Sequence, residues 1–250
     1  MQNFKDLVVV ISGASSGIGL ATGKAFVAEG AQVYNLDLVN SPDADEFHYI
    51  PTDITNTNSV NTSIARIDSE CQRIDVLVNN AGISFVGTVE ETGEDDWKRV
   101  FDVNVFGMAR LSSAAMPLLR KSKVPNIVNL CSVGALNGLP QRVLYDATKG
   151  AILSMTLAMA TDHVREGIRI NCVSPGTVRT AFVDKMVLKF PDPEKERAAL
   201  NARQATGRMV TPEEVAGAIL YLADPRSAST TGTSLEVDGG MHNLRMRPVQ

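Results

Sequence analysis

The stretch LVVVISGASSGIG, residues 7–19, joins a short apolar run to a glycine-rich turn. Five apolar residues in succession are typical of a strand that is buried on both faces of a sheet. Glycines directly after such a strand let the backbone turn tightly and approach a pyrophosphate, whose charge suits the N-terminus of the next helix. Gly13, Gly17 and Gly19 do not have the usual G-x-G-x-x-G spacing. Their place between a strand and a helix is therefore what predicts a dinucleotide-binding site.

Similar apolar runs recur along the chain, separated by segments with helical periodicity. The expected strands are residues 7–11, 32–36, 48–52, 75–79, 126–130, 169–173 and 233–237. Among the expected helices, TPEEVAGAILYLA at 211–223 opens with Thr211 as N-cap and Glu214 closing a capping box. Such alternation predicts an α/β fold, in which a doubly wound parallel sheet of about seven strands has helices on both faces. No repeat or linker divides the chain, so we expect residues 1–250 to form a single domain.

Composition excludes several classes of protein. The net charge of −4 and the lack of any run of Lys or Arg argue against nucleic-acid binding. Cys71, Cys131 and Cys172 have neither zinc spacing nor the pattern of a disulfide framework, so a reducing compartment is expected. The first apolar run is too short to cross a membrane or to act as a secretion signal. We therefore expect a cytoplasmic protein that binds no membrane and, because its three histidines are isolated in the sequence, no metal.

Two acidic residues follow the second and third expected strands. Asp37 lies 18 residues past Gly19, where a carboxylate can hold the adenine ribose hydroxyls and repel the 2′-phosphate of NADP. No arginine beside it counters that charge, so we expect NAD rather than NADP. Asp53 has two open interpretations: it binds the adenine amino group, or it caps the helix that begins near Thr57. The turn NNAG, residues 79–82, follows the fourth strand at the edge where such sheets bind ligands.

Tyr145 and Lys149 stand four residues apart at the start of an expected helix, in VLYDATKG, residues 143–150. Side chains at this spacing share one helix face. An ammonium close to a phenol favours the phenolate and so lowers the pKa of the tyrosine from its ordinary value of about 10. Taken alone, the two residues are either a proton-transfer device or a chance pair of the kind that many helices contain.

Almost forty residues separate the sixth expected strand from the helix at 212, with some helical pattern and no strand. A long insertion beside a sheet end is often a lid or recognition loop, and a plain surface excursion is the alternative. We expect residues of about 177–210 to form such a lid segment.

Together these motifs resemble those of the short-chain dehydrogenase/reductase family over nearly the whole chain. The matching elements are SGASSGIG, NNAG, the Asn of DVNVFG, the Ser of NLCSVG, YDATK, NCVSPGTVRT and the closing VDGG. The resemblance implies a Rossmann-type fold, a nicotinamide cofactor and a homotetramer or homodimer. It places that cofactor against Gly13, Ser15, Ser16, Gly17, Ile18, Gly19, Asp37, Asp53, Ile54, Asn80, Ala81, Gly82, Tyr145, Lys149, Pro175, Gly176, Val178 and Thr180.

The resemblance also implies a catalytic tetrad of Asn104, Ser132, Tyr145 and Lys149. In such a tetrad Ser132 hydrogen-bonds the substrate oxygen, and Tyr145 moves the alcohol proton as a hydride passes to or from nicotinamide. Lys149 assists Tyr145 and can hold the ribose hydroxyls.

Asn104 needs a hydrogen-bonding partner, because it falls on an otherwise apolar helical stripe and a buried amide without one is costly. The stripe consists of Trp97, Phe101, Asn104, Met108 and Leu111. The resemblance implies a bound water that links Asn104 to Lys149, and the alternative is an amide satisfied by local backbone.

Two arginines accompany the tetrad: Arg142, three residues before Tyr145, and Arg203, late in the lid segment. This placement is similar to that in type 2 3-hydroxybutyrate dehydrogenases and related sugar-acid dehydrogenases, where arginines at both positions are thought to face a substrate carboxylate. Met186 occupies the place of a third arginine of those enzymes, although Lys185 adjoins it. Surface ion pairs are the alternative role for the two arginines.

We therefore expect an NAD-dependent enzyme that interconverts a secondary alcohol and a ketone on a small hydroxy acid or sugar acid, bound by Ser132, Arg142, Tyr145 and Arg203. One alternative is a neutral aldose or polyol dehydrogenase. A 3-oxoacyl-carrier-protein reductase is less favoured, because Asp37 opposes NADP. A nucleotide-binding regulator without catalysis is a different class, and the intact tetrad argues against it.

Overall fold

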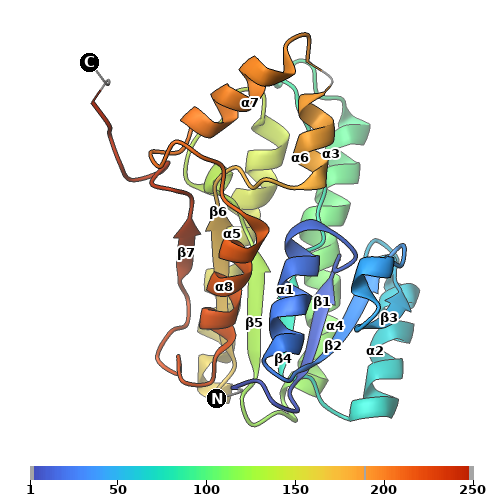
Figure 1. Ribbon diagram of the computed structural model, residues 1–250. Coiled ribbons are helices and arrows are strands. Elements are labelled where there is room, and N and C mark those ends of the chain that lie inside the picture. The colour runs from blue at the N-terminus through green and yellow to red at the C-terminus, as the bar shows by residue number, and fades with distance from the viewer. Residues whose placement is uncertain (1–2, 189, 248–250) are drawn as a thin grey trace.

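The computed structural model describes residues 3–188 and 190–247, in which seven parallel strands form one sheet (Figure 1). The strands are β1 Val8–Ser12, β2 Gln32–Asp37, β3 His48–Pro51, β4 Val76–Asn79, β5 Asn126–Leu130, β6 Arg169–Pro175 and β7 Ser234–Val237. Their order across the sheet is β3-β2-β1-β4-β5-β6-β7. The expected strands are confirmed, with ends shifted by at most two residues. The order reverses between β1 and β4, which is where a doubly wound sheet opens a crevice for a ligand.

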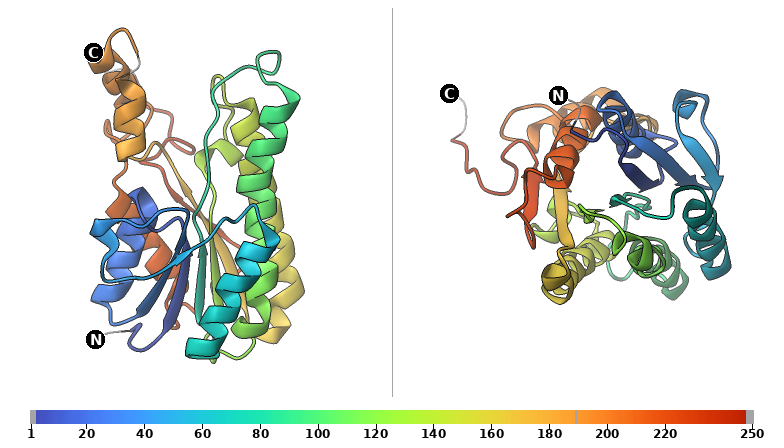
Figure 2. Two further views of the ribbon diagram at one scale, coloured as in Figure 1. Left: turned by 90° about the vertical axis from the view of Figure 1, so that its right-hand side faces the viewer. Right: turned by 90° about the horizontal axis from the view of Figure 1, so that it is seen from below.

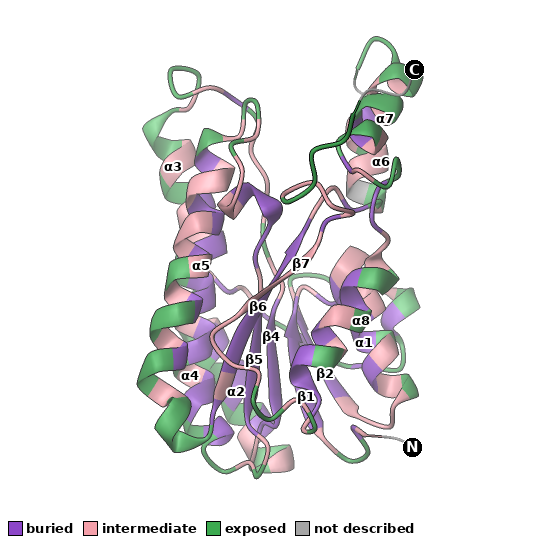
Figure 3. Ribbon diagram, turned by 90° about the vertical axis from the view of Figure 1, so that its left-hand side faces the viewer, coloured by how far each residue is buried: buried purple, intermediate pink, exposed green. Residues whose placement is uncertain are grey.

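Helices cover both faces of the sheet, as the apolar character of the strands on both sides requires (Figures 2 and 3). On one face α1 Gly17–Ala28 packs beside α8 Pro212–Ala223. On the other lie α2 Thr57–Cys71, α4 Met108–Leu119 and α5 Val143–His163. Each face has its own buried apolar cluster, so alternate residues of one strand, such as Val9 and Val10, contribute to opposite clusters.

The capping box that the sequence predicts at the start of α8 is present. The Thr211 side chain accepts a hydrogen bond from the Glu214 N–H at 3.3 Å, and the Glu214 carboxylate accepts one from the Thr211 N–H at 2.8 Å. Two donors that the helix itself cannot satisfy are thus paired, which stabilises a helix end by about 1 kcal/mol.

The apolar stripe from Trp97 to Leu111 does not lie on one regular helix. The chain forms α3 Glu94–Phe101, then a π-helical turn at Asp102–Gly107, then α4. π-helical turns are rare in proteins, and many of those that do occur lie at functional sites. The π-helical turn contains Asn104, so the irregular backbone coincides with the predicted catalytic residue.

The lid segment, residues 177–210, contains α6 Ala181–Val187 and α7 Pro193–Ala202 and rises beyond the carboxyl ends of the strands (Figure 1). Its two ends are joined at the base, because the Arg179 N–H donates to the Val210 carbonyl at 2.8 Å and the Val210 N–H donates to the Thr177 carbonyl at 2.9 Å. It has a small apolar cluster of its own, made of Val187, Leu200 and Met209 with neighbouring side chains.

Within residues 3–188 and 190–247, no helix combines the length and the apolar character that a membrane span needs. The same residues contain no cluster of three or more metal-ligating side chains.

Candidate active site

The glycine turn after β1 is tightly packed at Gly13 and Gly19. A Cβ on Gly19 would lie 2.2 Å from the Gly13 carbonyl oxygen and 2.5 Å from Nδ2 of Asn80. Gly13 has φ +72°, and a Cβ there would lie 3.0 Å from Cα of Ala81. Nδ2 of Asn80 donates to the carbonyls of Ser12 and Gly13, at 2.9 Å each. The NNAG turn therefore holds the glycine turn in place by hydrogen bonds at the same edge of the sheet.

The N-terminus of α1 is open to an anion. Ser16 is its N-cap but makes no capping hydrogen bond, and the first turn, which starts at Gly17 and Ile18, has no acidic residue. A Cβ on Gly17 would come no closer than 3.5 Å to another atom, and that atom belongs to Thr180 at the start of the lid segment. Uncapped N–H groups and the helix dipole suit a phosphate here, so the turn fits a dinucleotide.

Asp37 ends β2 beside this turn and holds it in place. Its Oδ2 accepts a hydrogen bond from the Ser15 N–H at 3.1 Å. The next two residues, Leu38 and Val39, are 69% and 64% exposed, and within the described chain no cation pairs with Asp37. The carboxylate thus stands at the edge of the crevice where the adenine ribose is expected.

Asp53 is not the N-cap of α2, so that interpretation is wrong. Asn56 caps the helix, its side chain accepting from the Ser59 N–H at 3.1 Å. Oδ1 of Asp53 instead accepts from the N–H and the hydroxyl of Thr55, at 2.9 and 2.7 Å. The neighbouring Ile54 is buried against Gly107 of the π-helical turn. Adenine binding by Asp53 and Ile54 stays a prediction.

Ser132 follows β5, Lys149 contacts the last residue of that strand, and Tyr145 lies beside Lys149. Ser132 is 7% exposed, and its Oγ accepts from the Gly134 N–H at 3.1 Å, which leaves the hydroxyl hydrogen free to be donated. Tyr145 lies in the first turn of α5, with Nζ of Lys149 at 5.6 Å from the centre of its ring. Lys149 is 5% exposed, and its ammonium donates to the Leu130 carbonyl at 2.8 Å, so two of its three hydrogens remain for other acceptors.

Asn104 is satisfied, but not by local backbone. Its Oδ1 accepts from the Ile83 N–H at 2.8 Å, while its Nδ2 donates to the Ile83 carbonyl at 2.9 Å and to Oγ1 of Thr148 at 3.1 Å. The local-backbone alternative is therefore wrong, because Ile83 precedes Asn104 by 21 residues and Thr148 belongs to α5. The amide thereby fixes the segment after NNAG to the helix that carries Tyr145.

The end of β6 continues this edge. A Cβ on Gly176 would lie 3.0 Å from Cα of Asp238, so only glycine fits after Pro175. Val178 is 8% exposed, and the Thr180 hydroxyl caps α6 by accepting from the Val183 N–H at 3.3 Å. These residues bring the start of the lid segment over the glycine turn.

Comparison with known proteins agrees with this geometry. A family model described as Enoyl-(Acyl carrier protein) reductase matches residues 13–242. Dehydrogenase/reductase SDR family member 6 of Rattus norvegicus is 38% identical, over 96% of this chain and 99% of that protein. Meso-2,3-butanediol dehydrogenase of Serratia marcescens is 37% identical, over 96% of either chain. The ligand-free aldohexose dehydrogenase of Thermoplasma acidophilum superposes with a TM-score of 0.94 at 35% identity, over 100% of this chain and 99% of that one. This chain belongs to the short-chain dehydrogenase/reductase family.

As a member of this family, the protein is an enzyme that interconverts alcohols and ketones with a nicotinamide cofactor. The glycine turn, the open N-terminus of α1 and the buried Lys149 are the features that fit that cofactor.

Arg142 of this dehydrogenase lies between the segment after NNAG and the lid segment. Nη1 of Arg142 donates to Oγ of Ser84 at 2.7 Å and to the Phe85 carbonyl at 3.1 Å, and Nη2 lies 3.9 Å from Sδ of Met186. Burial lowers the pKa of Arg142; of the charged groups around it, Tyr145 and Asp146 act to raise that pKa and Arg203 acts to lower it. Within the described chain neither arginine pairs with a carboxylate, so the surface ion-pair interpretation is wrong.

Sequence reasoning missed two residues that shape the site. His242 looked isolated, yet its Nδ1 lies 2.7 Å from Oδ1 of Asn137, five residues after Ser132. Gln204 is 1% exposed and holds the lid segment, accepting from the Thr177 N–H at 3.1 Å and donating to the Leu200 carbonyl at 2.8 Å. No sequence pattern marks either residue, because the contacts of His242 with Asn137 and of Gln204 with Thr177 join segments that are distant in the sequence.

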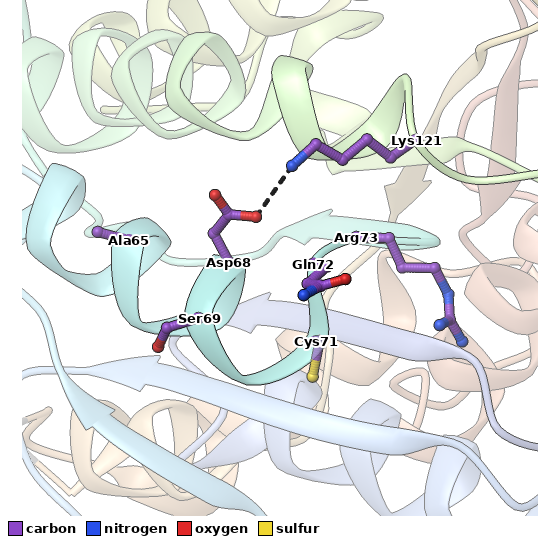
Figure 4. Close-up of a pocket in the computed structure, with 7 residues that line it drawn as sticks. All are labelled: Ala65, Asp68, Ser69, Cys71, Gln72, Arg73 and Lys121. Carbon is purple, nitrogen blue, oxygen red and sulfur yellow. Dashed lines mark hydrogen bonds and ion pairs between the residues drawn. The ribbon is translucent and has the colours of Figure 1, made fainter.

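A shallow hollow of about 750 Å³ lies at the opposite end of the sheet (Figure 4). It is formed where α2 ends before β4 and α4 ends before β5, and it contains the ion pair between Asp68 and Lys121. The amino ends of parallel strands are not where such folds bind their ligands, so the hollow is separate from the active site.

Proposed function

We propose that this enzyme uses NAD to oxidise a secondary alcohol on a small hydroxy acid or sugar acid. The observation that supports an acid substrate is that Arg142, three residues before Tyr145, and Arg203, in the lid segment, form no salt bridge within residues 3–188 and 190–247. A guanidinium donates two parallel hydrogen bonds to a carboxylate, so an arginine that forms no salt bridge within the protein is suited to bind a substrate carboxylate. Asp37 supports NAD over NADP, because its charge repels a 2′-phosphate.

A bound nicotinamide would supply the hydride acceptor, and the residues of this chain bind the substrate oxygen and move its proton. Ser132 donates its free hydroxyl hydrogen to that oxygen. Tyr145 takes the alcohol proton during oxidation and returns it during reduction. Lys149 presents its ammonium to Tyr145 and offers its remaining hydrogens to the ribose. Asn104 keeps the segment after NNAG at a fixed position against α5.

We further propose that the chain is one catalytic domain with a substrate lid at about 177–210, and that it works in the cytoplasm as a homotetramer or homodimer. A neutral aldose or polyol dehydrogenase is the second candidate. It is supported by Met186 in place of a third arginine and by the names of two similar proteins, which are an aldohexose and a butanediol dehydrogenase.

The two candidates differ in what a panel of substrates would do. Reduced cofactor is measured with NAD and a set of hydroxy acids and sugar acids, each beside its neutral counterpart. Replacing Arg203 with methionine should cut kcat/KM for the acids by roughly 10–100-fold, the value of one lost charged hydrogen bond, and spare the neutral compounds. Arg226→Met, which alters an arginine paired with Asp224 at the end of α8, is the matched control. Turnover of the neutral compounds alone, unaffected by Arg203→Met, would establish the second candidate.

A further inference from the structure

Asp146, the residue after Tyr145, lies inside the turn that carries Ser132. Its Oδ2 accepts a hydrogen bond from the Leu139 N–H at 2.9 Å, near the far end of that turn. Its Oδ1 is buried and has no hydrogen-bond partner in residues 3–188 and 190–247. Burial raises the pKa of the Asp146 carboxyl, while the Leu139 N–H and Arg142 act in the opposite direction. An orphaned buried oxygen is costly, so its presence needs an explanation.

The contact that Oδ1 does make is with the backbone of Gly134. A Cβ on Gly134 would lie 2.2 Å from Oδ1 of Asp146 and 3.1 Å from its Cγ, whereas Oγ of Ser132 would be at an ordinary 3.5 Å. Gly134 has no left-handed φ, so its backbone would accept alanine. It is the carboxyl of Asp146 that excludes a side chain at this position.

Gly134 in turn holds the catalytic serine. Its N–H donates to Oγ of Ser132 at 3.1 Å and so determines where that oxygen stands and which way the hydroxyl hydrogen is free to point. The turn is closed internally, because the Asn137 N–H donates to the Val133 carbonyl at 2.9 Å. The Asp146 carboxyl therefore packs against this turn at Gly134 and accepts a hydrogen bond from it at Leu139, on either side of that internal bond.

We infer that Asp146 is a positioning residue, which sets the place of the Ser132 hydroxyl relative to the Tyr145 hydroxyl through Gly134 and Leu139. Both ends of this link are rigid, since Asp146 adjoins Tyr145 on α5 and Gly134 bonds Ser132 directly. The position of one side chain thereby fixes the distance between the two groups that act on the same substrate oxygen. The inference rests on the proposed roles of Ser132 and Tyr145 and extends them to a residue outside the tetrad.

Four variants test the link: Asp146→Ala, Asp146→Asn, Gly134→Ala and the double variant of both alanines. Alanine at 134 must push the carboxyl away by about 1 Å, and misplacement of this size costs up to roughly 100-fold in rate. We expect Gly134→Ala to lower kcat by 10–100-fold and Asp146→Ala to lower it by about tenfold, with NAD affinity unchanged in both. With Asp146 already alanine, adding Gly134→Ala should change kcat by less than about twofold, because the clash no longer exists.

Two controls separate positioning from general damage. Asp146→Asn keeps an oxygen for the Leu139 N–H and should retain kcat within about threefold of the wild type. Gly138→Ala adds a methyl group nearby with nothing within 4 Å of it, and should leave kcat unchanged. Equal effects of Gly134→Ala in both backgrounds, or wild-type kcat in Asp146→Ala, would overturn the inference.

Amide hydrogen exchange of residues 133–139 in the NAD complex gives a readout that requires no substrate. Asp146→Ala should speed exchange in this turn and leave the glycine turn at 13–19 protected, whereas Asp146→Asn should exchange as the wild type does. Unchanged exchange in Asp146→Ala would refute the claim that the hydrogen bond from the Leu139 N–H to Asp146 holds this turn in place. If no compound of the substrate panel is turned over, this result still decides the inference, so a wrong substrate assignment and a wrong role for Asp146 are distinguishable.

Discussion

Replacing Asn104 with alanine should destabilise the protein more than replacing Asn126, a buried amide outside the site that makes fewer hydrogen bonds. The side chain is 2% exposed and makes three hydrogen bonds, two to Ile83 and one to Thr148. A buried group that loses its partner costs about 1–3 kcal/mol. The half-buried Ile83 can recover part of this from water, and the Thr148 hydroxyl still donates to the Tyr145 carbonyl at 2.7 Å. We therefore expect a loss of about 3–5 kcal/mol in the free energy of unfolding.

Asn126 provides the matched control. It is 0% exposed, but its Nδ2 makes a single hydrogen bond, to the Leu222 carbonyl at 3.2 Å, and its Oδ1 has no partner in the described chain. Asn126→Ala removes the same atoms and should cost only about 1–2 kcal/mol. The difference between the two variants isolates the hydrogen bonds from the cavity that both leave.

The assay is denaturant unfolding of the cofactor-free protein, supported by calorimetry, in which 1 kcal/mol corresponds to about 2–4 °C in Tm for a chain of this size. Asn104→Ala should therefore melt at least several degrees below Asn126→Ala. Equal losses in the two variants would refute the claim that Asn104 joins the segment after NNAG to α5.

Two further predictions concern charge. Asp37→Ala should reduce the ratio of kcat/KM for NAD to kcat/KM for NADP by more than tenfold. The reason is that like charges about 6 Å apart near a surface repel by roughly 3 kcal/mol before screening. An unchanged ratio would show that Asp37 does not distinguish the two cofactors at the adenine ribose. At the opposite end of the molecule, Arg120 and then His163 lower the pKa of Glu166 from 4.5 to about 2. Folding lowers the pKa of Glu166, so its ion pair stabilises the folded protein at pH values above the pKa that Glu166 has in the unfolded chain. This stabilisation is lost as the pH falls towards 2. The wild type should therefore be more stable than Arg120→Met at neutral pH and should lose that advantage in acid, and an advantage that persists at pH 2 would contradict the assignment.

The sequence sufficed for those parts of the site that local rules govern. Five apolar residues followed by glycines predict the turn that ends β1, because burial on both faces and the need for close approach act within a few residues. The spacing of Tyr145 and Lys149 predicts a shared face for the same kind of reason, since a helix has a fixed period. Both features are present in the structure.

Contacts between segments that are distant in the sequence could not be predicted from the sequence. Asp53 and Asn56 are equally good caps by residue type, and only the point at which α2 starts decides between them. The partner of Asn104 lies 21 residues away, and the partner of His242 lies 105 residues away. The contact between Arg142 and Met186 joins residues 44 apart and likewise depends on where the lid segment packs. The periodicity of apolar residues does not predict such packing, because the packing arises from the tertiary structure alone.

The most direct test of the account is Tyr145→Phe, which removes the hydroxyl and keeps the ring beneath Lys149. We expect NAD affinity close to that of the wild type and turnover lower by a hundredfold or more, because general acid–base catalysis contributes about 10²–10⁴-fold. Turnover is measured with the most active alcohol of the substrate panel, and NAD affinity by titration calorimetry on the same preparation. Ordinary turnover in this variant would contradict the proton-transfer role of Tyr145, and with it the mechanism proposed for the enzyme.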